Sequence, residues 1–192
     1  MPPKKHNARK AKEIQLPELV QIWECREQQT MMSPKEWATV ISILQKLLPE
    51  YAVRDFTNLE NDHCYIVEVL LHKGQIPFLD DGLELIAQVG GSARVLQTFV
   101  SRIAPYYYGY VWEMSANGAD GNLRFAYPKR AQLSQREKQI TVLIERLLKS
   151  FGYQSLPPRT AATVVPDIET ECLNKGEVTI FHLLFSELFS VR

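Results

Sequence analysis

The chain has 192 residues, 45% hydrophobic and 23% charged, which is typical of one folded globular domain and excludes a largely disordered chain. The 22 basic and 22 acidic residues balance, and no apolar run is long enough to cross a bilayer. Three separated cysteines, Cys25, Cys64 and Cys172, and the lack of a secretory signal favour a reducing, cytoplasmic location over a disulfide framework.

The first twelve residues differ from the rest of the chain in charge. They contain no acid and five cations, namely Lys4, Lys5, Arg9, Lys10 and Lys12. The remaining 17 cations face 22 acids, so residues 13–192 have a formal charge of −5. We expect a basic flexible tail at 1–12 and one acidic domain at 13–192. Such a tail is also able to contact nucleic acid.

Two helices are predicted near the start of the domain. Apolar residues at helical spacing predict the first over 16–28. In the second, Ser33 and Glu36 form a capping box before an apolar stripe that Pro49 ends.

Residues 62–74 predict a central strand, because Val, Ile, Leu and Tyr occupy both of its faces. Glu68 is the exception on one face. A buried carboxylate must be paired, shifted in pKa or functional. Glu68 is therefore a candidate site residue.

The next segment predicts two helices separated by a glycine pair. The first begins near Asp80 or Asp81, and Gly90 and Gly91 end it. The second is predicted from Ser92 to Ile103, because its apolar residues recur at helical spacing.

Residues 106–114 predict a strand with an aromatic stripe. Side chains alternate across a strand, so Tyr106, Tyr108, Tyr110, Trp112 and Met114 share one face. The turn formers in 115–122 and the alternation in 123–128 predict a hairpin. We expect Glu113 opposite Arg124, which places Trp112 opposite Phe125 and Tyr110 opposite Tyr127. The stripe is either buried core or partly exposed as a binding surface.

The C-terminal third predicts one strong helix and one strand. Ser134 and Glu137 form a second capping box, and Gly152 suits a left-handed C-cap. Residues 153–167 are expected to be extended or loop because they contain three prolines. A turn at 174–176 then precedes a two-faced strand at 177–185.

Catalytic and metal-binding motifs are absent from the sequence. The histidines and cysteines match no zinc spacing, and no glycine-rich phosphate loop is present, so we expect no metal and no cofactor. We expect two groups of acids to contact a basic partner. Asp80 and Asp81 lie at the start of a predicted helix, and Asp167, Glu169 and Glu171 alternate along the chain, which favours their exposure on one face.

The sequence thus predicts a single α+β domain with an antiparallel or mixed sheet of about four or five strands and four or five helices mainly on one face. Our first hypothesis is a non-enzymatic protein-binding domain of the bacterial cytoplasm, with toxin-neutralising (immunity) proteins as one example. Its partner would have a basic surface and contact the aromatic hairpin and these acids. One alternative is a nucleic-acid-associated protein that uses the basic tail and aromatic stacking. The other is a hydrolase-type enzyme with a site near Glu68, His63 or His182.

Overall fold

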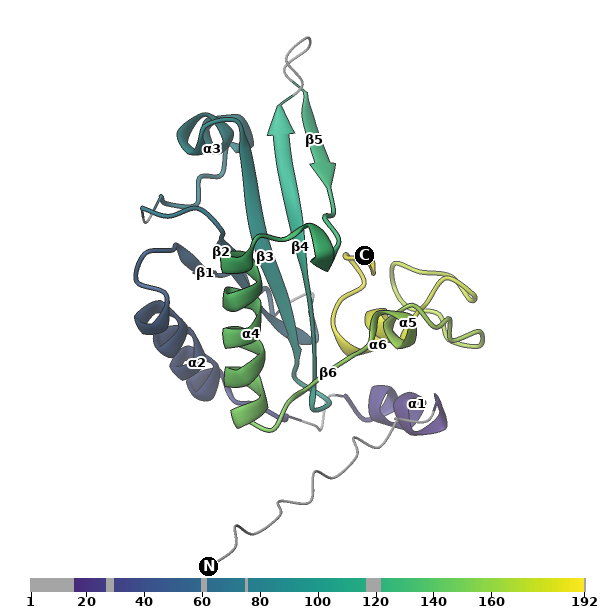
Figure 1. Ribbon diagram of the computed structural model, residues 1–192. Coiled ribbons are helices and arrows are strands. Elements are labelled where there is room, and N and C mark those ends of the chain that lie inside the picture. The colour runs from purple at the N-terminus through teal and green to yellow at the C-terminus, as the bar shows by residue number, and fades with distance from the viewer. Residues whose placement is uncertain (1–15, 27–29, 60–61, 75, 117–121, 192) are drawn as a thin grey trace, which may run out of the picture.

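A mixed sheet forms the centre of the molecule (Figure 1). The computed structural model describes residues 16–26, 30–59, 62–74, 76–116 and 122–191. Within these ranges the strands are β1 (Val53–Asp55), β2 (Cys64–Leu70), β3 (Ser92–Ser101), β4 (Tyr106–Ala116), β5 (Leu123–Ala126) and β6 (Gln154–Ser155). Strands β1 to β5 are antiparallel neighbours in chain order, and β6 pairs with β4 in parallel. The predicted α+β class is confirmed, with a slightly larger sheet than expected.

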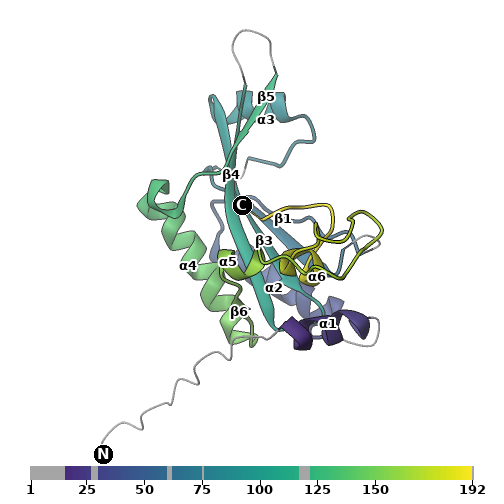
Figure 2. The same ribbon diagram turned by 90° about the vertical axis from the view of Figure 1, so that its right-hand side faces the viewer.

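Helices cover both faces of the sheet rather than mainly one (Figure 2). The helices described are α1 (Leu16–Glu24), α2 (Pro34–Leu47), α3 (Gly82–Val89), α4 (Gln135–Ser150), α5 (Pro158–Ala161) and α6 (Ile180–Leu184). The two longest, α2 and α4, pack on the face of Tyr65, Val100 and Tyr107. The other four pack on the opposite face, with α1, α5 and α6 at one end and α3 at the other. None of the helices described is long and apolar enough to cross a membrane.

The predicted helix boundaries are confirmed where a cap marks them. Ser33 and Ser134 each accept a hydrogen bond from the backbone of the glutamate three residues on, which closes both capping boxes. Asp81 caps α3 by accepting from two backbone N–H groups, and Gly90 ends that helix at a φ of 84°. Glycine adopts this left-handed backbone conformation at little energetic cost because it has no Cβ.

Residues 92–101 form strand β3, so the helix predicted over 92–103 is wrong. Its last nine residues are almost all buried, because β2 and β4 flank it and helices cover both faces. A strand buried on both faces has apolar residues at nearly every position, including those at helical spacing. β-branched residues such as Val95, Thr98 and Val100 fit the extended conformation better.

The strand predicted at 177–185 is also wrong, because its centre is the short helix α6. Thr179 caps this helix, and all five of its residues are buried. A helix surrounded by protein on every side has no polar face, so its sequence shows no helical periodicity. The turn at 174–176 before it is confirmed.

The hairpin of β4 and β5 is present, and its register differs from the predicted one by two residues. Met114 lies opposite Phe125, and Glu113 lies opposite Ala126. Glu113 pairs instead with Arg94 of β3, with Nε and Oε2 2.8 Å apart. A shift of two residues keeps every side chain on its predicted face, so the aromatic stripe is preserved.

Candidate functional site

The aromatic stripe of β4 is core at one end and surface at the other. Tyr106 and Tyr108 are buried against α6, whereas Tyr110 and Trp112 are only half-buried. Across the hairpin, Phe125 is 56% exposed and Tyr127 is also exposed. Their rings extend the stripe diagonally, with centroids 6.0 Å from Trp112 and 5.9 Å from Tyr110, respectively. Helix α6 covers the first part of β4 and α3 buries Met114 near its other end, so Tyr110 and Trp112 between them are only partly covered. Figure 1 shows the two helices at opposite ends of the sheet.

Helix α3 adds apolar and acidic side chains next to this exposed end. A Cβ on Gly82 would lie 3.0 Å from the Leu123 side chain, so α3 packs closely on the hairpin. Leu83, the next residue, is 44% exposed. We call the group Leu83, Leu123, Phe125 and Tyr127 the hairpin surface. The exposed acids Asp80, Asp81 and Glu84 lie at the start of α3 and form its acidic rim.

The other predicted contact acids lie elsewhere on the molecule. Asp167, Glu169 and Glu171 are exposed in the loop between α5 and α6, at the end of the sheet away from α3 (Figure 1). The structure therefore brings Asp80 and Asp81, but not these three acids, to the hairpin.

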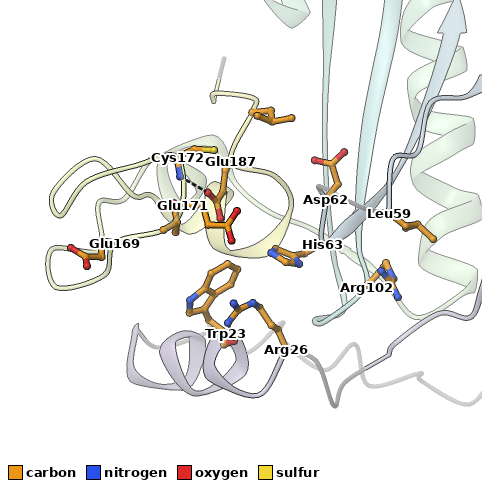
Figure 3. A pocket seen from close by; sticks show the side chains of 12 residues that line it. Trp23, Arg26, Leu59, Asp62, His63, Arg102, Glu169, Glu171, Cys172 and Glu187 are labelled. Carbon is orange, nitrogen blue, oxygen red and sulfur yellow. Dashed lines mark hydrogen bonds between the residues drawn. The ribbon is translucent and has the colours of Figure 1, made fainter.

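A polar cavity of about 560 Å³ lies beside this C-terminal loop (Figure 3). Trp23 and Arg26 reach it from the end of α1, and Asp62 and His63 from the start of β2. The C-terminal loops add Glu169, Glu171, Cys172 and Glu187, and Arg102 comes from the end of β3.

Three residues that line this cavity, His63, Trp23 and Arg26, contact one another. The rings of His63 and Trp23 meet edge to face with centroids 4.9 Å apart, and the Arg26 guanidinium lies 4.0 Å from the Trp23 ring centroid. Burial, and then the charge of Arg26, lower the pKa of His63 below its usual 6.5. His63 is therefore largely neutral at pH 7.

This neutral state predicts a pH-dependent stability. An unfolded chain takes up the His63 proton near pH 6.5, before the folded chain does, so stability falls as the pH drops below that value. We expect this decrease to be smaller in His63→Gln. Urea unfolding at pH 7.5 and 5.5 measures it, with His72 and His182 as a background common to both proteins. An equal decrease in both proteins would refute the assignment.

Two buried side-chain atoms at the cavity have no hydrogen-bond partner within the described ranges. Asp62 is 4% exposed, and its Oδ1 atom has no hydrogen-bond partner within the described ranges. The same is true of Nε of Arg102. Burial raises the pKa of Asp62. No group of three or more His, Cys, Asp and Glu residues in the described part is arranged to hold a metal ion.

Glu68 and His182 do not line this cavity, so the three residues of the enzymatic alternative do not share it. Glu68 is 2% exposed and accepts from Arg54 at 2.5 Å and from Gln97 at 3.0 Å. Nδ1 of His182 accepts from the Thr179 backbone N–H at 3.0 Å, within the cap of α6. Both residues therefore have structural partners.

Sequence reasoning missed most of the cavity residues, because they come from five separate segments of the chain that only the fold brings together. The exposure of Leu83 could have been predicted from the sequence. Leu85 and Ile86 form the buried face of α3, and Leu83 does not lie on that face. The tail cations Lys4, Lys5, Arg9, Lys10 and Lys12 lie outside the described residues. No protein family, curated protein or solved structure matched this chain in our comparisons.

Proposed function

We propose that this chain is a non-enzymatic protein that binds a partner protein through the hairpin surface. The observation that supports the proposal is the exposure of Phe125 and Leu83, at 56% and 44%, on adjacent elements. Scattered apolar residues are normal on protein surfaces, whereas an apolar group with a polar rim is typical of interaction sites. Aromatic side chains also contribute more binding energy than most others.

The acidic rim favours a partner with a basic surface. Asp80, Asp81 and Glu84 are exposed at one side of the apolar group, where they can steer and orient a cationic partner. A toxin-neutralising role in the cytoplasm is one specific form of this proposal. Binding of nucleic acid through residues 1–12 is the competing hypothesis.

Affinity capture with surface variants tests this proposal. The immobilised full-length chain is used to retain partners from a nuclease-treated lysate of the source cells, and each retained protein is purified and titrated. Phe125→Ala is expected to weaken binding about thirtyfold, the effect of a central aromatic contact. Leu47→Ala is the matched control, because Leu47 is 50% exposed on α2, on the opposite side of the sheet.

Two results would contradict the proposal. One is a partner whose affinity is the same for wild type and Phe125→Ala. The other is retention that occurs only in a parallel lysate without nuclease treatment, or that deletion of residues 1–12 abolishes, which would favour the nucleic-acid hypothesis. The melting temperature of each variant shows that the fold is intact.

A further inference from the structure

The outer edge of β4 is paired at both ends and open in the middle. On the side away from β3, β6 pairs with Tyr106 and Tyr107, and β5 pairs with residues 113–116. Within the described ranges, no strand pairs with residues 108–112 on this side. We call the unpaired space beside residues 108–112 the edge gap.

The backbone groups of Gly109 and Val111 point into the edge gap. The carbonyl of Tyr107 accepts from the Leu156 N–H on this side at 2.8 Å. Peptide groups alternate in direction along a strand, so every second residue from Tyr107 faces the same edge. Continuing the register of β5 would place Val111 opposite Pro128, which has no N–H to donate. This proline explains why β5 ends at Ala126.

A cavity of about 310 Å³ follows the edge gap. Its walls are Gly109 and its neighbours on β4, the segment 127–130 after β5, Thr141 and Glu145 of α4, and Ser155 and Leu156. A smaller cavity of about 40 Å³ shares Gly109, Thr141, Glu145 and Ser155 with it. The smaller cavity reaches Tyr107, which is 3% exposed and whose hydroxyl has no hydrogen-bond partner in the described part of the chain.

We propose that the edge gap binds an extended segment of a partner protein, which pairs with Gly109 and Val111 as an added strand. Backbone donors and acceptors two residues apart are the pattern that an extended chain matches, and strand addition to an open edge is a known mode of peptide recognition. Gly109 lacks a side chain and is exposed, so another backbone can approach it closely.

The surroundings specify the chemistry of this segment. A serine or threonine over Gly109 suits the small cavity and gives the Tyr107 hydroxyl a partner. At the rim, Arg130 pairs with Glu145 at 3.6 Å, whereas Lys129 has no carboxylate partner among the described residues. We therefore expect the bound partner segment to carry acidic residues next to its serine or threonine residues, where they can pair with Lys129. This site shares Tyr127 with the hairpin surface, whereas Leu83, Leu123 and Phe125 do not line its cavity.

Amide hydrogen exchange of the free full-length protein tests whether the edge is open. Gly109 and Val111 are expected to exchange much faster than Tyr110, whose N–H faces β3. Equally slow exchange of all three amides would overturn the proposal. Protection that increases with protein concentration would also overturn it, because a second copy of the chain would then fill the gap.

Synthetic pentapeptides with capped, uncharged ends test which kind of segment the edge gap binds. The probe is Glu-Thr-Val-Thr-Glu, compared with Lys-Thr-Val-Thr-Lys and with two versions N-methylated on alternate residues. We expect the acidic peptide to bind more tightly than the basic one and to protect Gly109 and Val111. Methylation of the set whose N–H groups face β4 is expected to weaken binding about tenfold, and methylation of the other set less than threefold.

Protein variants separate this site from the hairpin surface. Gly109→Val is expected to abolish peptide binding, because the new side chain meets Thr98 and fills the smaller cavity that the serine or threonine of the peptide would enter. Phe125→Ala is expected to leave it unchanged, so each proposal can fail without the other. Equal binding of both methylated peptides, or binding without protection of the two amides, would overturn strand addition.

Discussion

Replacing Arg54 with alanine is expected to lower the free energy of unfolding by about 3–5 kcal/mol, the usual result of leaving a buried charge unpaired. Glu68 is 2% exposed, and Arg54 is its only cationic partner among the described residues. The remaining hydrogen bond from Gln97, itself bound by the Tyr110 hydroxyl at 2.8 Å, does not neutralise the carboxylate.

The Arg54→Ala loss is expected to be larger at pH 7 than at pH 5. Burial already raises the pKa of Glu68, and Arg54 opposes this effect. Without Arg54 the folded pKa rises further, so the buried carboxyl is protonated at acidic pH and its penalty decreases. Urea unfolding at both pH values measures the difference.

The double variant Arg54→Ala, Glu68→Gln is the control for this prediction. It buries no charge, so it should lose less than half as much stability as Arg54→Ala alone. A loss that is the same at both pH values, or that the second substitution does not reduce, would show that Glu68 is not the cause.

Phe181→Ala is expected to destabilise the protein by about 3–5 kcal/mol, the usual cost of removing a buried phenylalanine ring. Phe181 is fully buried in α6, and its ring centroid lies 5.2–5.4 Å from those of Phe99, Tyr108 and Phe185. Its removal leaves a cavity between α6 and the sheet. The melting temperature should fall by about 6–20 °C for a chain of this size.

Phe125→Ala is the matched control for Phe181→Ala. It removes the same ring from an exposed position, so it should change the unfolding free energy by less than about 0.5 kcal/mol. Comparable losses in the two variants would contradict the burial of α6 and the exposure of the hairpin end.

The parts of the fold that the sequence predicted correctly have a local cause. Helices α2 and α4 carry capping boxes at Ser33 and Ser134, and each has one polar face. The hairpin has turn formers between two alternating segments. The two wrong assignments, at Ser92–Ser101 and Ile180–Leu184, concern segments buried on almost all sides. Burial removes the polar residues that reveal a period, so tertiary packing decided those conformations.

The candidate site was predictable to a similar extent. Strand alternation identified the shared face of the aromatic stripe, and Phe125 and Tyr127 are exposed on that face. Whether Tyr108 or Trp112 would be covered depended on the position of α6, which the sequence did not predict. The polar cavity around His63 depends on long-range contacts between α1, β2, β3 and the C-terminal loops, and no local pattern marks it.

Site-specific photocrosslinking tests most directly whether the hairpin surface binds a partner. A photoreactive phenylalanine analogue is placed at position 125 or, as the control, at position 47, in the full-length chain expressed in its source cells. We predict one discrete crosslinked protein from position 125, none from position 47, and loss of that product when Leu83→Ser is added. Identical products from both positions, or no product from position 125, would contradict the proposed binding function.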